Sequence, residues 1–191
     1  MEPSLLIRPA TLHDTQAMLD IYAPYVSQTA VSFEYEVPSF EDFQRRLTTI
    51  SERYPWLVVE KDGRIEGYAY ASSFHPRAAY RWSAEASIYL RMESRGKGLG
   101  RGLYLELENI LKAQHFHRLY ACIAHTDIED EYLSHASIHF HERMGYRLVG
   151  SFPECAFKFQ RWYGMCWMEK RLAGSGIPSD IIPFPDLTSA L

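Results

Sequence analysis

Apolar residues follow two different spacings along the chain, and these spacings predict its helices and strands. In four segments apolar residues recur every three to four positions, as on one face of a helix. These segments are 11–25, 39–50, 98–113 and 134–144. Seven shorter apolar segments predict strands. They are 4–9, 54–60, 65–74, 84–91, 118–124, 146–152 and 156–170.

The order of these segments predicts a single α/β domain around a mixed sheet. Pro24 is expected to kink or end the first helix, since proline has no amide N–H to donate. Asp62-Gly63 lies between two strands and predicts a tight hairpin. Ser39 marks the start of the second helix, and Gly145 suits the end of the last one.

The composition limits the class of protein. A chain of 191 residues with 47% hydrophobic and 23% charged residues suits one packed domain. The net charge of −4 argues against a broad nucleic-acid-binding surface. No apolar run approaches the roughly 18 residues that cross a membrane. The cysteines lack CxxC spacing, which argues against a disulfide framework or a zinc ribbon and favours the cytoplasm.

The end of the chain has a different composition from the rest. Residues 173–191 are rich in glycine, proline and serine, and we expect them to form a tail behind a domain that spans 1–172. Ile181, Ile182 and Phe184 are apolar residues by which the tail can pack on the domain.

The most informative motif is RGKGLG, residues 95–100, between the strand at 84–91 and a helix. A helix N-terminus offers free amide N–H groups and the positive end of its dipole, and glycines let an anion approach closely. The motif is not a Walker A loop, because Gly98 follows Lys97, and it does not fit the Rossmann pattern. It therefore predicts a phosphate or pyrophosphate site, with a solvated glycine loop as the alternative.

This run resembles the pyrophosphate loop of the GNAT N-acetyltransferases, whose pattern is Arg/Gln-x-x-Gly-x-Gly/Ala. Further stretches are similar, in order, to the phosphinothricin and methionine sulfoximine N-acetyltransferase subgroup. They are IRPAT (7–11), YPWLVVE (54–60), GYAYAS (67–72), AYRW (79–82), SIYL (87–90), ASIHFHERMGY (136–146) and FKFQRW (157–162). The resemblance covers 5–172 and implies a GNAT fold, with a mostly antiparallel sheet, splayed central strands and flanking helices. It also implies acetyl-CoA, no metal and a homodimer.

The resemblance implies how acetyl-CoA binds. The glycine loop would hold the pyrophosphate, and the backbone of the preceding strand would hold the pantetheine arm, with the amide of Leu90 or a neighbour facing the thioester oxygen. The implied set is Ile88, Tyr89, Leu90, Arg95, Gly96, Lys97, Gly98, Leu99, Gly100, Ser134 and Ser137.

Two residues are candidates for catalysis. An amine attacks a thioester only when it is neutral, so a base is useful. Glu85 lies among apolar strand residues, where burial raises a carboxyl pKa, and the resemblance assigns it the role of base. The alternative is a half-exposed carboxylate or one paired with Arg81. His141 stands where many relatives have tyrosine, which implies an acid for the leaving thiolate or a contact with CoA; a packing role is the alternative.

Five residues are candidates for binding the acceptor. Arg77 and Arg81 flank Tyr80 in the loop before Glu85 and could clamp a carboxylate, because arginine binds carboxylates through two parallel N–H groups. Phe33 and Glu34 are similar to the substrate-side wall of the subgroup. Solvated arginines and a core phenylalanine are the alternatives.

The chain departs from the subgroup at three places. Ser134 replaces an asparagine that contacts CoA, although serine can still cap the helix. Gly164 replaces an aspartate, and the polar insert 127–133 is longer than usual.

His135 and His139 have the spacing of two metal ligands, but residue 136 is alanine and not the glutamate of HExxH, so we expect a surface pair.

These observations lead to one expected activity and two alternatives. We expect acetyl transfer from acetyl-CoA to the α-amine of a small amino acid or analogue, by direct attack in a ternary complex. An acetyltransferase acting on peptide or protein N-termini is the first alternative. A non-catalytic acyl-CoA-binding module is the second.

Overall fold

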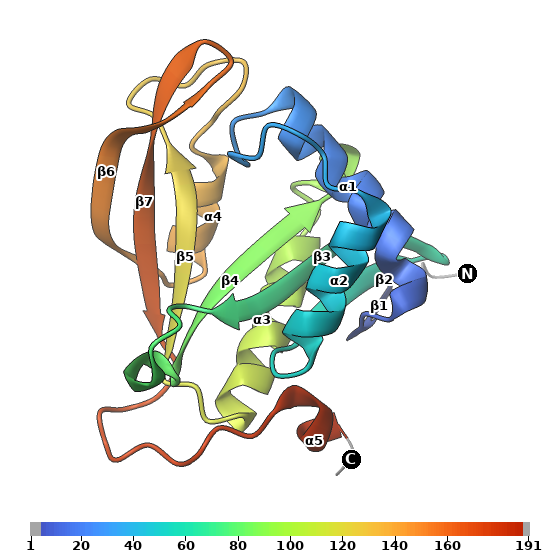
Figure 1. Cartoon of the computed structure of the whole chain (residues 1–191), viewed down its shortest axis with the longest axis vertical. Helices are drawn as coiled ribbons and strands as arrows, with labels where there is room; N and C mark the ends of the chain where they lie inside the picture. Colours follow the sequence, from blue (N-terminus) through green and yellow to red (C-terminus); the bar gives the residue numbers. More distant parts are fainter. Residues whose placement is uncertain (1–4, 189–191) are drawn as a thin grey trace.

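A seven-stranded sheet runs through the molecule in the order β1-β2-β3-β4-β5-β7-β6. The computed structural model describes residues 5–188 (Figure 1). The strands are β1 (Leu5–Pro9), β2 (Trp56–Lys61), β3 (Arg64–Ser73), β4 (Ser83–Leu90), β5 (Arg118–His125), β6 (Arg147–Lys158) and β7 (Arg161–Arg171). Neighbouring strands are antiparallel except for β4 and β5, which are parallel. This is the mixed, mostly antiparallel sheet that the sequence predicted.

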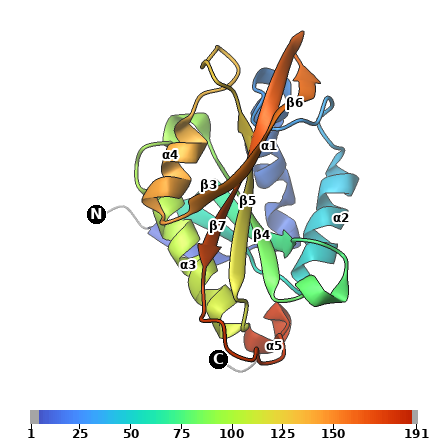
Figure 2. The ribbon, with the colours of Figure 1, turned by 90° about the vertical axis from the view of Figure 1, so that its left-hand side faces the viewer.

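Helices cover both faces of the sheet. They are α1 (Thr15–Gln28), α2 (Phe40–Ser51), α3 (Leu99–Ala113), α4 (Ala136–Arg143) and the short α5 (Phe184–Thr188). Figure 2 shows α1 and α2 on one side of the sheet and α3 and α4 on the other. The predicted order of strands and helices up to β7 is confirmed. Within residues 5–188, no helix is long and apolar enough to cross a membrane.

Local sequence signals place several element ends correctly. The Ser39 hydroxyl accepts a hydrogen bond from the amide of Asp42 at 3.1 Å, as an N-cap does. Asp62 and Gly63 both have positive φ, at 51° and 80°, and turn β2 into β3 in two residues. Gly145 follows α4 with a φ of 86°, which glycine adopts without strain.

The first helix does not end at about residue 25, as the sequence predicted, because α1 continues past Pro24 to Gln28. The buried stripe of α1 extends past the proline and includes Ile21, Tyr25 and Val26. Packing of this stripe against the sheet therefore outweighs the hydrogen bond that proline cannot make.

The predicted break between the last two strands, at 153–155, is also wrong. β6 continues to Lys158, and the turn lies at Phe159 and Gln160, which have φ values of 51° and 61°. An irregularity in the register between Phe152 and Ala156 accommodates Pro153. β6 is an edge strand, where proline is tolerated because one row of amides has no partner strand.

The central strands β4 and β5 pair only at their first residues. The register joins Ser83 to Arg118, Ala84 to Leu119 and Glu85 to Tyr120, and then ends. Beyond Glu85 the two strands diverge, as Figure 1 shows. The splay implied by the resemblance is therefore confirmed, and it opens the middle of the sheet.

The chain after β7 lies along the end of α3. The amide of Ile182 donates to the carbonyl of Gln114 at 3.2 Å, and the Gln114 side chain donates to the carbonyl of Ile182 at 2.7 Å. The side chain of Phe184 is buried. This segment closes the lower edge of the molecule in Figure 1.

Candidate functional site

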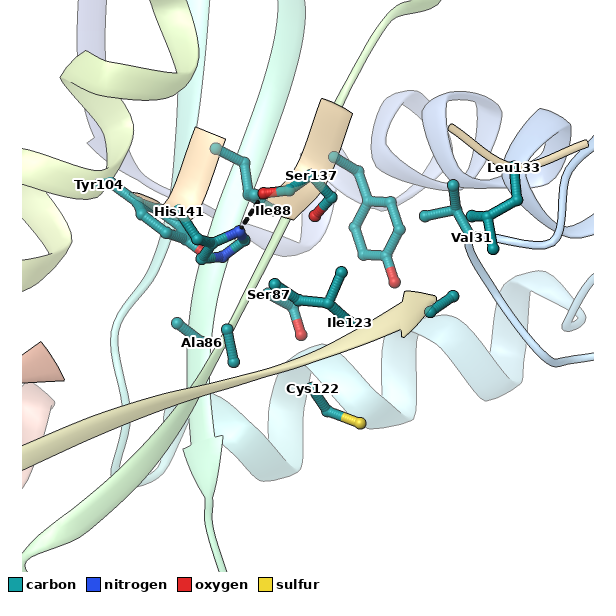
Figure 3. Close-up of a pocket in the computed structure, with 13 residues that line it drawn as sticks. Val31, Ala86, Ser87, Ile88, Tyr104, Cys122, Ile123, Leu133, Ser137 and His141 are labelled. Atoms are coloured by element: carbon teal, nitrogen blue, oxygen red, sulfur yellow. Dashed lines mark hydrogen bonds between the residues drawn. The ribbon is translucent and has the colours of Figure 1, made fainter. Parts of the chain in front are cut away.

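A narrow cavity of about 60 Å³ lies where β4 and β5 part. Figure 3 shows side chains from these strands and from α3 and α4 converging on it. It is lined by Val31, Ala86, Ser87, Ile88, Tyr89, Tyr104, Ala121, Cys122, Ile123, Ala124, Leu133, Ser137 and His141. We call this cavity the slot.

One edge of the β4 backbone faces the slot. The amide of Arg91 donates to the carbonyl of Glu66, so the backbone N–H and C=O groups of odd-numbered residues in β4 point toward β3. The backbone groups of even-numbered residues therefore point to the other edge of β4, where β5 has moved away. At that edge the Tyr25 hydroxyl donates to the carbonyl of Leu90 at 2.6 Å and accepts from its amide at 3.3 Å. The peptide groups of Ile88 face the slot and can pair with an extended, amide-containing ligand.

The glycine loop lies beyond the end of β4 and begins α3. Gly96 and Gly98 have positive φ values of 74° and 81°, and Gly98 is the N-cap residue of α3. The amides of the first turn, from Leu99 onward, have no partner within the helix, as in every helix. A Cβ on Gly100 would lie 3.3 Å from side-chain atoms of Ile88 and Phe140, so glycine lets α3 approach β4 and α4. The result is a turn of free amides suited to an anion.

Tyr25 connects this loop to β4, and the sequence reasoning missed it. Besides its bonds to Leu90, its hydroxyl accepts from Nε of Arg95 at 3.3 Å, and the Arg95 guanidinium lies 4.9 Å from the centre of its ring. Arg95 is thereby held beside the loop. Tyr25 belongs to the apolar stripe of α1, and nothing in its spacing distinguishes it from a core residue.

Glu85 is half-buried on β4, on the face opposite α3. Burial raises the pKa of its carboxyl above the ordinary value of 4.5. It is close enough to Tyr104 and Cys122 to affect both groups electrostatically. The alternative pairing with Arg81 is not observed, because Arg81 pairs with Asp180 at 2.7 Å. Glu85 is therefore a desolvated carboxyl beside the slot without an arginine partner among the described residues.

His141 and Tyr104 form a buried pair at the wall of the slot. His141 Nδ1 lies 2.7 Å from the carbonyl oxygen of Ser137, which can only accept, so Nδ1 carries the proton. Nε2 then accepts from the Tyr104 hydroxyl, 2.9 Å away. Burial lowers the pKa of His141 to about 4, so the ring is neutral at pH 7. Tyr104 was missed because it lies within the buried stripe of α3.

A model of the acetyltransferase (GNAT) domain matches residues 7–167. The chain belongs to the GNAT acetyltransferase family. It is 30% identical over 177 residues to phosphinothricin N-acetyltransferase of Streptomyces viridochromogenes, and the match covers 93% of each chain. It is 32% identical to the L-methionine sulfoximine/L-methionine sulfone acetyltransferase of Pseudomonas aeruginosa, over 88% of this chain and 95% of that protein.

A solved structure supports the same family. A GNAT superfamily phosphinothricin acetyltransferase from Sinorhizobium meliloti, in complex with acetyl-CoA, superposes with a TM-score of 0.85. The two chains are 32% identical, and the match covers 95% of this chain and 96% of the other. The chain is a GNAT enzyme that uses acetyl-CoA, and the glycine loop and the β4 edge offer the amides that such a molecule requires.

In this GNAT enzyme the residues expected to bind the acceptor carboxylate lie in one short 3-10 turn, and each contacts different neighbours. Arg77 is exposed at the start of a 3-10 turn. Tyr80 packs its ring near those of Phe74 and His75, at centroid distances of 5.9 and 4.8 Å. Arg81 lies over the Trp82 ring and pairs with the C-terminal segment. The clamp of Arg77 with Arg81 stays a prediction.

Phe33 and Glu34 follow α1 near the mouth of the slot. Phe33 packs beside Leu133 and Tyr163. The Glu34 carboxylate accepts from Arg46 of α2 at 2.7 Å. Glu34 therefore has a cationic partner within the protein, which the sequence spacing did not reveal.

The start of α4 differs from expectation. The helix begins at Ala136 with His135 as its N-cap residue, so the expected cap at Ser134 is wrong. The carboxylate of Glu129, in the polar insert, accepts a hydrogen bond from the amide of His135 at 2.6 Å. Ser137 lines the slot, as expected for a residue near the co-substrate.

His135 and His139 lie with ring centres 6.2 Å apart. The His135 ring also contacts the carbonyl oxygen of Thr126, at 2.8 Å from Nε2. Across residues 5–188, no group of three or more histidine, cysteine, aspartate or glutamate side chains has the arrangement of a metal site.

The low pKa of His141 predicts a pH-dependent stability. Between pH about 6.5 and about 4 the unfolded chain binds a proton at His141 that the folded chain does not. The free energy of unfolding should therefore fall as the pH drops through this range, by up to about 3 kcal/mol from this residue. His141→Gln should lose less stability over the same range in urea unfolding, while the exposed control His13→Gln should behave as the wild type. Equal pH dependence in wild type and His141→Gln would contradict the prediction.

Proposed function

We propose that the enzyme acetylates the α-amine of a small amino acid or analogue of the phosphinothricin or methionine sulfoximine type. The carrying observation is a half-buried carboxyl, Glu85, on the strand β4, whose next residues line the slot and which runs on toward the glycine loop. The named activities of the two curated relatives support this acceptor class. A cavity as small as about 60 Å³ also suits a small acceptor better than a protein surface.

Acetyl-CoA supplies an acetyl thioester that is already activated. In this proposal the amides of Gly98, Leu99 and Gly100 bind its pyrophosphate, with Arg95 and Lys97 adding positive charge. The slot-facing backbone of Ile88 binds the pantetheine amides, and Ser137 of α4 lines the opposite wall. The Leu90 amide, already bonded to Tyr25, is less suited to the thioester oxygen than the amide of Ile88.

Glu85 acts as the base. Its carboxylate accepts a proton from the acceptor ammonium, and the neutral nitrogen then forms the new bond to the acetyl carbon as the carbon–sulfur bond breaks. The nitrogen loses its second proton in this step, and that proton restores the thiol of the CoA thiolate that leaves. Direct attack is favoured over an acyl-enzyme, because burial raises the pKa of the Cys122 thiol to about 12 and leaves it a poor nucleophile.

His141 serves in its neutral form. An imidazole with a pKa of about 4 holds almost no proton to give at pH 7, which disfavours the role of acid for the leaving thiolate. The other expected role, a contact with the co-substrate, fits better. His141 holds the Tyr104 hydroxyl at 2.9 Å and shapes the wall of the slot.

We also propose that the enzyme is a homodimer. Large apolar side chains are exposed on the edge strand β6 and its neighbour β7. They are Leu148, Val149, Phe152, Phe157 and Trp162. Exposed apolar side chains on an edge strand favour association.

The acceptor class is tested by release of free CoA thiol from acetyl-CoA over a panel of amines. The panel contains phosphinothricin, methionine sulfoximine, methionine sulfone, ordinary amino acids and a peptide that begins with methionine. We expect turnover with one or more free amino acids and little with the peptide. Turnover with the peptide alone would favour an N-terminal acetyltransferase, and acetyl-CoA binding without any turnover would favour a non-catalytic module.

Replacing the base tests the mechanism. Glu85→Gln should lower kcat by about 10²-fold or more, because the amide cannot accept the proton. Since burial raises the pKa of Glu85, wild-type turnover should rise with pH through a value above 4.5, and this step should vanish in the variant. Calorimetry should show unchanged acetyl-CoA affinity, and Glu106→Gln on the outer face of α3 is the control. Wild-type turnover of Glu85→Gln at every pH would exclude this role.

The dimer is tested by sedimentation. The wild-type chain should sediment at twice its mass of 22.2 kDa. Phe152→Glu should shift it toward the monomer, because burying a carboxylate in an apolar interface is unfavourable. Leu12→Glu introduces the same charge at another exposed position and should leave the dimer intact. A monomeric wild type at micromolar concentration would refute the proposal.

A further inference from the structure

Lys158 is a buried lysine that the proposed mechanism does not use. It is the last residue of β6 and only 3% exposed. Its Nζ donates to the carbonyl oxygens of Val26, Thr29 and Ser32, at 2.7, 2.9 and 2.6 Å. An ammonium has three N–H donors, so all three are satisfied, by residues more than 120 positions away in the sequence.

This ammonium is held by backbone groups. Among the described residues, no carboxylate lies within 4 Å of it. Burying a charge without a counter-ion is unfavourable by several kcal/mol unless hydrogen bonds and dipoles compensate. Here three charge-assisted bonds do so, and Val26 and Thr29 lie at the C-terminal end of α1, where the helix dipole favours a cation.

Two of the carbonyls that Lys158 binds, those of Thr29 and Ser32, lie in the segment 29–35, the first part of the connection between α1 and α2. Val31 of this segment lines the slot, and Phe33 packs beside it. The segment is also held from its other side, because the amide of Ala30 donates to the carbonyl of Tyr132 at 2.9 Å. Its position therefore depends on contacts with distant parts of the chain.

The polar insert 127–133 supplies this second contact. Oδ1 of Asp130 accepts from the amides of Tyr132 and Leu133, each at 2.8 Å. Its Oδ2 accepts from Arg161 and from the Tyr163 hydroxyl of β7, at 2.9 and 2.8 Å. Leu133 lines the slot.

The Tyr132 ring stacks on Phe159 at 4.2 Å, beside Lys158 at the turn between β6 and β7. The β6–β7 hairpin thus touches the insert through Phe159 and the segment 29–35 through Lys158. One hairpin holds two neighbouring segments at the mouth of the slot.

We propose that Lys158 is a positioning residue for the acceptor: its ammonium fixes the segment 29–35 against the β6–β7 turn and so sets the wall beside which the amine binds. The inference rests on the proposed function for its effect on turnover. Lys158 does not touch the slot, so its effect reaches the acceptor through Val31 and Phe33. The glycine loop and Ile88 lie on other elements and should bind acetyl-CoA without it.

Lys158→Met tests the proposal, because methionine keeps the length of the side chain and removes all three donors. With the amino acid that the wild type uses best, we expect KM for the acceptor to rise about tenfold, as a displaced wall mispositions the amine. KM for acetyl-CoA should stay within twofold. Lys158→Arg keeps the charge and should recover part of the loss, and Lys61→Met at an exposed position should match the wild type.

Hydrogen–deuterium exchange supplies a second readout that does not depend on catalysis. Amides of 29–35 should exchange faster in Lys158→Met, while those of α3 should not change. If this variant does not fold, Lys158→Gln, which keeps two N–H donors, is judged by the same criteria.

A folded variant with wild-type acceptor KM, or with unchanged exchange at 29–35, would overturn the proposal. A lower melting temperature with unchanged acceptor KM would also overturn it, since the lysine would then be merely structural. A wild type that acetylates no amine would instead refute the proposed function.

Discussion

The parting of β4 and β5 after Glu85 is the constraint on which the rest of the site depends. Two parallel strands that stop pairing leave backbone N–H and C=O groups facing each other across a gap, and such groups require partners. At the end of β4 the Tyr25 hydroxyl supplies both partners of Leu90. Nearer the middle, Ile88 faces the slot, where an extended ligand with its own amides can satisfy its peptide groups. The sheet therefore carries an incomplete hydrogen-bond ladder that a co-substrate can complete.

Burial around this gap shifts the pKa values of two groups in opposite directions. It raises the pKa of Glu85 and lowers that of His141, because in both cases it disfavours the charged form. For a carboxyl this increases basicity, which suits a group that must remove a proton from an ammonium. For an imidazole it removes the acidic proton, which leaves a neutral ring that can hold Tyr104 in place. The same low-polarity environment thus separates the two candidates into a proton acceptor and a structural partner.

The features that could be predicted from sequence are those fixed by neighbours along the chain. The cap at Ser39, the Asp62-Gly63 turn and the glycine loop each depend on a few consecutive residues, and the structure contains all three. Contacts between distant parts of the chain could not be predicted. The bond of Tyr25 to Leu90 spans 65 positions, and the pairing of Arg81 with Asp180 spans 99. A residue pattern carries no information about partners that only the fold brings together.

The end of the slot proposed to bind acetyl-CoA and the end proposed to bind the amine are built from different parts of the chain. The co-substrate end consists of backbone groups on α3 and β4, whose geometry is fixed by regular hydrogen bonding and by glycines. The other end consists of side chains on connecting segments, which have no ladder of their own and need external support. Lys158 supports the segment 29–35, and Asp130 supports the insert 127–133. Changes in the connecting segments can therefore alter which amine fits while the amides that face acetyl-CoA stay in place. The polar insert 127–133 belongs to these connecting segments, and its Leu133 lines the slot.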